Sequence, residues 1–599
     1  MKDFFKYVLA TVVGLVVAGL LMLFMGVLTI FGLASSSDGD VTIDSNSVLT
    51  LKLDGTLAER AESPSPLDML GDINPLGGGG STIGLDDVLS AIEKAKDNEN
   101  IKGIYIEAAT LDAQPASYEA IRDALADFKA NTDKFIIAYG DNYDQMMYYL
   151  ASVADKVLLN PQGTLDWHGL AGMNMFYKDL MDKLGIEVEI FKVGTFKSAV
   201  EPYMLTEMSD ANREQIAAYI GSIWNNFTKE VAASRNISTD ALNKLAEEGA
   251  MFKTGQELIA AGLVDSLIYK NDIRAFLNRQ MGLEEDKKIS SYGITQMRSV
   301  KRNTPKDKSG NIVAVYYAYG EIDATTSMMG ISTSEGINSE KVIKDLRDLK
   351  DDDDVKAVVL RVNSPGGSAY GSEQIWYAIT QLKEKKPVIV SMGDLAASGG
   401  YYISCNADTI VAEPTTLTGS IGIFGMIPNL EKVMNKIGVN VDVEKTNTLA
   451  DMGNTFRPMT ESEKVLMQRL VEKGYDLFTM RCADGRGMTQ AQIDAIGQGR
   501  VWTGEMALER GLVDVLGGLD DAIEIAVKKA GINAYTLKNY PEDEDSMFGA
   551  IMDMMSGKIM SKQILQGDAA HIFNDVYSIS QIDKLDRLQA RMPNVVIIR

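Results

Sequence analysis

The chain of 599 residues is too long for one hydrophobic core, and its length predicts several domains. Hydrophobic residues make up 45% and charged residues 24%, which is typical of globular proteins. The net charge of -24 argues against a nucleic-acid partner, because phosphate binding requires a positive surface. The two cysteines, Cys405 and Cys482, argue against a disulfide framework or a thiolate zinc site.

The chain begins with a candidate membrane anchor. Lys2 and Lys6 precede an uncharged run over residues 7–34, and acidic residues follow it. A spanning helix needs about 20 apolar residues, whereas the core of a cleaved signal peptide has about 7 to 15. The run therefore predicts a transmembrane helix within residues 1–36, with the N-terminus in the cytoplasm and the rest of the chain outside. Cleavage near Ala34 is the alternative.

Two segments of the chain are copies of one unit. KAKDNENIKGIYI parallels DLKDDDDVKAVVL, and FKTGQELIAAGLVDSL parallels VWTGEMALERGLVDVL. The copies span about residues 85–267 and 338–516, which places them in predicted domains 45–290 and 310–535. A Met-rich tail over 536–599 is predicted to serve packing or oligomer contacts.

Within the second copy, short apolar runs alternate with segments of helical spacing. The runs at 311–320, 355–363 and 386–394 are typical of buried strands, and the segments 372–386 and 461–478 are typical of helices. Such alternation predicts an α/β fold with parallel strands joined by helical crossovers.

The copies differ where the second carries glycines and a serine. Its strand at 355–363 is followed by Gly366 and Gly367, and its next strand is followed by Ser398-Gly399-Gly400. In the first copy Gln145-Met146-Met147 stands in place of Ser398-Gly399-Gly400. A serine can attack a carbonyl carbon, and glycine N–H groups can hold the developing oxyanion. The pattern predicts an acyl-transfer site; a serine N-cap with closely packed glycines is the structural alternative.

A serine nucleophile needs a base, and the chain has only two histidines. His168 and His571 are interpreted as packed or surface residues, because neither lies in the second copy. A lysine can act as base when burial lowers its pKa from about 10.4 towards neutrality. Lys197 lies among apolar residues in FKVGTFKSAVEPY of the first copy, and the second copy has no lysine at that position. Taken alone, Lys197 would be read as a surface lysine.

Four motifs resemble the signal peptide peptidase A (protease IV) family in its long, duplicated, membrane-anchored form: GTFKSAVEP, NSPGGS, GDLAASGGYYIS and TGSIGIFG. The resemblance implies two tandem Clp protease/crotonase-like α/β units after an N-terminal transmembrane helix. It implies a serine endopeptidase with a Ser/Lys dyad that degrades cleaved signal peptides through an acyl-enzyme, without cofactor or metal. The implied roles are nucleophile for Ser398, general base for Lys197, lysine orientation for Ser420, and oxyanion binding for Gly399 and for Gly366 or Gly367.

The resemblance also implies a homotetramer that takes hydrophobic peptides as substrates. Residues 7–34 would hold it in the bacterial cytoplasmic membrane, with the catalytic domains on the periplasmic side. On this hypothesis one copy kept the nucleophile and the other kept the base after duplication. Two alternatives are a crotonase-type acyl-CoA enzyme and a non-catalytic membrane scaffold.

Overall fold

The computed structural model describes Gly14 and residues 42–61, 82–300, 309–328, 331–334, 336–542, 588–592 and 597–598. Apart from Gly14, the predicted anchor over 7–34 lies outside the described residues. Among the helices that are described, none has the length and apolar composition needed to cross a bilayer.

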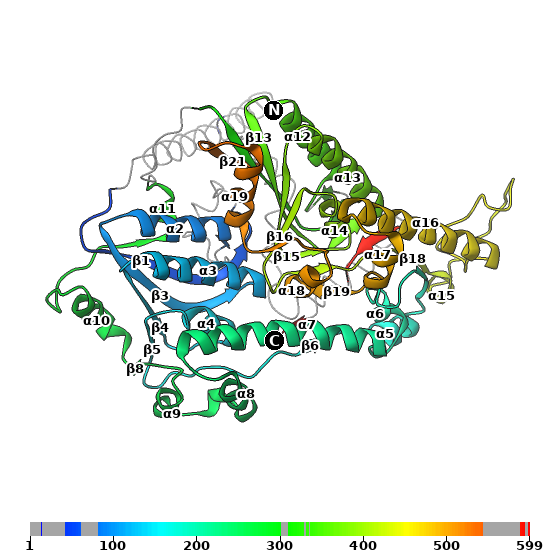
Figure 1. Cartoon of the computed structure of the whole chain (residues 1–599). Coiled ribbons are helices and arrows are strands. Elements are labelled where there is room, and N and C mark those ends of the chain that lie inside the picture. Colours follow the sequence, from blue (N-terminus) through cyan, green and yellow to red (C-terminus); the bar gives the residue numbers. More distant parts are fainter. Residues whose placement is uncertain are drawn as a thin grey trace, which may run out of the picture.

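The first copy forms a parallel sheet with the strand order β2-β1-β3-β4-β5-β8, and β9 pairs with β1. Its strands are β1 (Ser47–Ala58), β2 (Thr82–Gly84), β3 (Ile101–Asp112), β4 (Phe135–Gly140), β5 (Lys156–Leu159), β8 (Ser266–Leu267) and β9 (Ser291–Gly293). Its main helices are α2 (Leu85–Asp97), α3 (Pro115–Asn131), α4 (Gln145–Ala151), α7 (Asp210–Arg235) and α10 (Ile273–Gln280). Figure 1 shows this copy in blue to green, with the long helix α7 running horizontally towards the second copy, above α8 and α9.

The second copy repeats this arrangement with the order β19-β17-β15-β13-β10-β21, and β16 pairs with β15 and β20. Its strands are β10 (Ile312–Tyr319), β13 (Val355–Ser364), β15 (Val388–Ala397), β16 (Thr409–Ala412), β17 (Leu417–Gly419), β19 (Val501–Thr503), β20 (Val515–Leu516) and β21 (Thr536–Tyr540). The three predicted strands and their parallel pairing are confirmed. Of these pairs, only β17–β19 is antiparallel.

Helices cover both faces of the second sheet, which explains why its strands are apolar at nearly every position. In β13, Val358 and Leu360 pack in one hydrophobic cluster and Ala357 and Val359 in another. The first cluster includes residues of α12 (Ser339–Asp351), α13 (Ala369–Lys383) and α16 (Glu461–Arg486), and the second includes residues of α19 (Leu519–Ala530). The predicted helices at 372–386 and 461–478 are therefore confirmed as α13 and α16.

Shorter elements complete the described fold. The helices are α5 (Lys178–Leu184), α6 (Glu201–Met204), α8 (Thr239–Glu248), η2 (Ala250–Phe252), α9 (Gly255–Ala260), η3 (Lys270–Asp272), α11 (Ile294–Arg298), α14 (Gly399–Ser404), α15 (Glu431–Lys436), α17 (Gln490–Ile496) and α18 (Gly504–Glu509). The strands are β6 (Gly172–Met173), β7 (Glu187–Lys192), β11 (Thr325–Met328), β12 (Ile331–Ser334), β14 (Gly366–Ser368), β18 (Phe424–Asn429), β22 (Gln589–Arg591) and β23 (Ile597–Ile598). A small sheet with the order β14-β22-β18-β7 joins the two copies.

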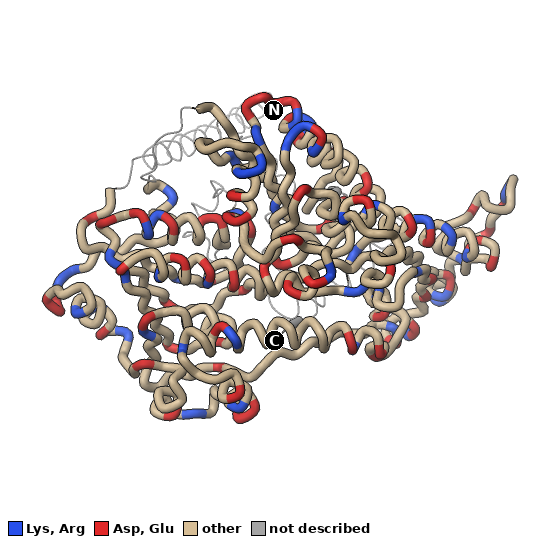
Figure 2. Tube along the Cα trace, in the orientation of Figure 1, with Lys and Arg blue, Asp and Glu red and all other residues tan. Residues whose placement is uncertain are grey.

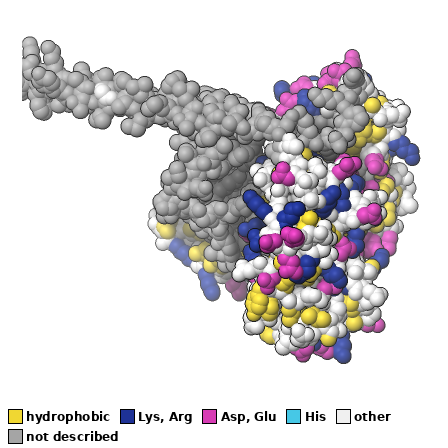
Figure 3. All heavy atoms as spheres, turned by 90° about the vertical axis from the view of Figure 1, so that its left-hand side faces the viewer, with side chains coloured by type: hydrophobic (Ala, Val, Ile, Leu, Met, Phe, Trp, Pro, Cys, Tyr) yellow, Lys and Arg dark blue, Asp and Glu magenta, His cyan; other side chains and the backbone are white. Residues whose placement is uncertain are grey.

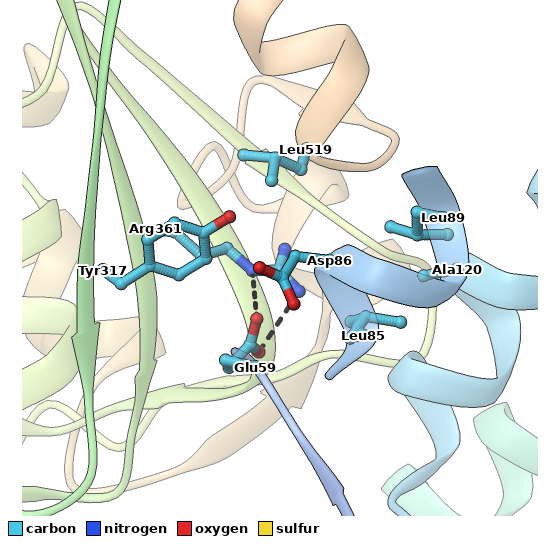
Figure 4. A pocket seen from close by; sticks show the side chains of 8 residues that line it. All are labelled: Glu59, Leu85, Asp86, Leu89, Ala120, Tyr317, Arg361 and Leu519. Carbon is cyan, nitrogen blue, oxygen red and sulfur yellow. Dashed lines mark hydrogen bonds and ion pairs between the residues drawn. The ribbon is translucent and has the colours of Figure 1, made fainter. Parts of the chain in front are cut away.

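Buried polar contacts also join the copies. Arg361 Nε of β13 lies 2.9 Å from Glu59 Oε2, and the two side chains are only 4% and 6% exposed. Figure 4 shows this pair beside Asp86 of α2, with Leu519 of α19 opposite. Ser117 of α3 donates to Asp394 from its backbone N–H (2.8 Å) and its hydroxyl (2.6 Å). The copies therefore meet through specific partners, which fixes their relative placement.

The described surface carries charges of both signs. Figure 2 shows acidic and basic residues interspersed along both copies. Figure 3 shows the same mixture on one side of the molecule, where hydrophobic side chains gather towards the lower end.

Candidate active site

Ser398 occupies a sharp turn between strand β15 and helix α14. Its backbone has φ 55° and ψ -111°, and its N–H donates to the Gly419 carbonyl at 2.8 Å. Positive φ is uncommon for a non-glycine residue, and such strain often marks functional sites. Although Ser398 is the N-cap residue of α14, its side chain caps no N–H of that helix within the described chain. The alternative of a capping serine is therefore wrong, and the turn leaves Oγ to face another partner.

Lys197 reaches this turn because a strand of the first copy crosses onto the second. Strand β7 pairs antiparallel with β18 over six residues, from Glu187–Asn429 to Lys192–Phe424. Beyond the strand, the Phe196 N–H donates to the Gln498 carbonyl at 2.9 Å. Gln215 of α7 then donates to the Phe196 carbonyl at 3.1 Å. These backbone contacts fix the position from which the lysine side chain extends.

The two side chains meet in a fully buried place. Lys197 Nζ lies 2.8 Å from Ser398 Oγ, and neither residue is exposed to solvent. Burial lowers the pKa of Lys197 well below its usual value of 10.5, because desolvation disfavours the charged amine. A neutral amine at this distance is able to accept the serine proton. The structure therefore brings together the predicted serine and lysine of one chain, which are 201 positions apart.

Ser420 holds the lysine amine from a second side. Lys197 Nζ donates to the Ser420 carbonyl at 3.1 Å and lies 3.2 Å from Ser420 Oγ. Ser420 itself has φ 50° and follows Gly419, whose φ is 78°. Its N–H donates to the Arg500 carbonyl at 2.7 Å. This anchored, strained turn aims both Ser420 oxygens at the amine.

The three predicted oxyanion glycines lie beside the serine but differ in where their N–H groups point. The Gly366 N–H donates to Ser364 Oγ at 3.1 Å. The Gly366 carbonyl accepts from the Ile322 N–H, and the Ser368 N–H donates to the Ile322 carbonyl. Because backbone groups alternate in direction along a strand, the N–H of Gly367 points to the side away from Ile322. Gly399 is the first residue of α14, and the first N–H groups of a helix have no carbonyl acceptor within the helix. Gly367 and Gly399 are therefore better placed than Gly366 to donate to a bound carbonyl.

The corresponding place in the first copy is filled. Gln145, which stands where the second copy has Ser398, accepts from the N–H groups of His168 and Gly169 at 2.9 Å. It also donates to the Gly169 carbonyl at 3.0 Å. Trp167, which stands where the second copy has Ser420, is fully buried. The first copy thus uses these positions for packing.

The histidines take no part in this geometry as far as the chain is described. His168 Nδ1 lies 2.8 Å from Asp166 Oδ1, and the His168 side chain is 47% exposed. His571 lies outside the described residues.

Two glycines that sequence reasoning missed enclose Lys197. A Cβ on Gly422 would lie 3.1 Å from Lys197 Cδ, and a Cβ on Gly499 would lie 2.6 Å from Lys197 N and Cβ. Both glycines belong to the second copy and the lysine to the first, so no spacing within either segment signals the contact.

Comparison with known proteins agrees with the fold. The model of peptidase family S49 matches residues 129–284 and 380–533, and that of Clp protease matches residues 311–415. "Protease 4" of Salmonella typhi is 40% identical over 79% of this chain and 76% of its own length. "Protease 4" of Haemophilus influenzae is 36% identical over 89% and 88%. "Serine protease SPPA, chloroplastic" of Arabidopsis thaliana is 30% identical over 81% and 69%.

The chain therefore belongs to peptidase family S49, and it is a serine protease with two Clp protease-like α/β units. Because both copies match, it represents the tandem duplicated form of signal peptide peptidase A.

Proposed function

We propose that this protein is an endopeptidase that works through a Ser398/Lys197 dyad. The 2.8 Å contact between Lys197 Nζ and Ser398 Oγ, in a site where burial lowers the pKa of the lysine, is the observation that carries the proposal. The neutral amine takes the serine proton as Oγ attacks the scissile carbonyl. The resulting ammonium protonates the leaving amine, and the same lysine then activates water to hydrolyse the acyl-enzyme.

The oxyanion of each tetrahedral intermediate is held by the N–H groups of Gly367 and Gly399. Preorganised donors of this kind stabilise charge that develops only in the transition state, each at about 3 to 4 kcal/mol. Ser420 is a positioning residue, because it contacts the amine and not the scissile bond. Its two oxygens direct the amine towards Ser398.

The substrates are proposed to be hydrophobic peptides, above all cleaved signal peptides. The relatives, both named proteases, support proteolysis, and the family resemblance supports this substrate class. Residues 7–34 would anchor the enzyme in the bacterial cytoplasmic membrane with both copies on the periplasmic side, since the run is uncharged and preceded by Lys2 and Lys6. An enzyme placed there meets signal peptides where they are released.

We further propose assembly into a ring of four chains. The sequence GVNVDVEK at 438–445 is the second-copy counterpart of GIEVEIFK, which contains β7. In this segment Val439, Val441 and Val443 are 40–47% exposed, and it forms no strand in the described chain. Because β7 pairs with β18 of the second copy, the repeat suggests that 439–445 pairs with residues 171–176, the counterpart of β18, in a neighbouring chain. Such head-to-tail contacts form a ring when the rotation from one chain to the next closes. The ring and the number of four chains come from the family resemblance.

The proposed dyad is tested by turnover of a fluorogenic peptide ester by the detergent-solubilised full chain. Ser398→Ala and Lys197→Ala should each lower kcat/KM by at least about 10³-fold. Lys192→Ala, at the end of β7 and before Lys197 in the chain, should leave it unchanged. Only chains that keep Ser398 should form an acyl adduct with a serine-directed fluorophosphonate. Near-normal turnover by a folded Lys197→Ala protein would place the base elsewhere.

A further inference from the structure

Residues 588–592, which contain strand β22, lie in the active site. Strand β22 runs between β14, which carries Gly366 and Gly367, and β18. It pairs antiparallel with β14 in a register that sets Gly367 opposite Ala590, and its Gln589 pairs with Phe424 of β18. In Figure 1 it is the red strand beside β18. An extended segment thus occupies the place where strand addition would hold a peptide.

The register directs one carbonyl of this segment at the oxyanion glycines. The Met592 N–H donates to the Pro365 carbonyl at 2.7 Å, and the Ala369 N–H donates to the Leu588 carbonyl at 3.3 Å. Hydrogen-bonded pairs alternate along an antiparallel ladder, so the pair midway between these two, Gly367 and Ala590, is also hydrogen-bonded. The Gly367 N–H therefore points at the Ala590 carbonyl oxygen.

The neighbouring glycines surround the same oxygen. A Cβ on Gly366 would collide with the Ala590 oxygen, and a Cβ on Gly399 would lie 3.0 Å from it. The bare backbone at both positions is thus needed for the carbonyl to fit. The Ala590 carbonyl occupies the position in which a scissile carbonyl would be polarised.

The side chains of the segment are also matched by the protein. Ala590 is fully buried in the hydrophobic cluster of the second copy, against which Leu588 also packs, and Met592 is buried in the cluster of the first copy. Arg591 Nη1 lies 3.1 Å from Glu321 Oε1. Contacts on both sides of the Ala590–Arg591 bond hold it in one register.

We propose that residues 588–592 bind the active site as an internal substrate and that Ser398 cleaves the Ala590–Arg591 bond; this rests on the proposed dyad. Ser398 Oγ bonds to the Ala590 carbonyl carbon, the C–N bond to Arg591 breaks, and the Arg591 nitrogen takes the proton held by Lys197. One water then hydrolyses the ester, leaving a carboxylate on Ala590 and regenerating the serine. The products are a chain that ends at Ala590 and the peptide 591–599. Until that cut, the segment excludes other peptides from the groove.

The buried position of Ala590 extends to other substrates. A side chain larger than alanine at the residue before the cut would displace the packed cluster around it. Peptide substrates should therefore be cut after small residues, with an apolar residue two positions earlier in the place of Leu588.

Intact-mass spectrometry of the purified full chain tests the cleavage. The wild-type chain should end at Ala590, and Ser398→Ala should end at Arg599. Ala590→Trp should stay uncut because the buried position has no room for an indole, whereas Arg591→Lys, which keeps a cation opposite Glu321, should still be cut. Wild-type protein that hydrolyses the peptide ester yet keeps Arg599, or is cut at another bond, overturns the inference while leaving the dyad intact.

Binding by inactive protein tests occupancy of the groove separately. A fluorescein-labelled peptide of residues 586–595 should bind Ser398→Ala at least tenfold more tightly when the chain is truncated after Arg587, because the internal competitor is gone. Equal affinities would show that the segment does not occupy the groove. If wild type neither hydrolyses the ester nor reacts with the fluorophosphonate, the proposed function itself fails.

Discussion

Replacing Gly499 by alanine should disable the enzyme without touching the serine or the lysine. Gly499 has φ 80°, and a Cβ there would lie 2.6 Å from both Lys197 N and Lys197 Cβ. Carbon atoms pack at about 3.5 to 4.0 Å, so the lysine backbone must retreat by roughly 1 Å. Misplacement of a catalytic group by about 1 Å costs on the order of 10²-fold in rate. We therefore expect kcat for the peptide ester to fall about 100-fold, with KM little changed.

Gly487→Ala is the matched control. Gly487 ends helix α16 with φ 63°, and a Cβ there would meet no described atom within 4 Å. Both variants carry the cost of about 1 to 2 kcal/mol for an L-residue in a left-handed conformation, but only Gly499→Ala presses on Lys197. The control should lose a similar amount of thermal stability and keep full turnover. Equal kcat for the two variants would refute the argument that the Lys197 position limits the rate.

Three further predictions concern stability. Lys197→Met should abolish turnover yet raise the unfolding temperature at pH 7. The lysine of the unfolded chain binds a proton that the buried amine, with its lowered pKa, does not bind, so wild-type stability rises with pH. The stability advantage of the variant should therefore shrink towards pH 10.5. Arg361→Met should lower the free energy of unfolding by about 3 to 5 kcal/mol, because Glu59 stays buried without the guanidinium that neutralises it. Adding Glu59→Gln should restore most of this loss, as chemical denaturation would measure. Burial raises the pKa of Glu413 from 4.5 to about 8, so between these pH values the native carboxyl keeps a proton that the unfolded chain releases. Stability therefore falls as the pH rises through this range. Glu413→Gln should make the unfolding temperature depend less on pH between pH 5 and 8.

The sequence by itself determined the local structure and the chemical parts. Apolar runs identified β10, β13 and β15, because strands buried on both faces are apolar at nearly every position. Comparison of the two copies singled out Ser398 as present in one and Lys197 as present in the other. These signals are local, since each depends on residue type and spacing within a short segment.

The tertiary structure alone decided which parts meet. The contact between Lys197 and Ser398 depends on β7 crossing to β18, and the choice of Gly367 over Gly366 depends on bonds to Ile322. The placement of β22 beside the glycines likewise depends on segments more than 200 positions apart. Sequence patterns can indicate that a residue is buried, but its partner depends on how the two copies pack against each other. The residues that form these contacts are far apart in the sequence and follow no regular spacing, so no local pattern identifies them.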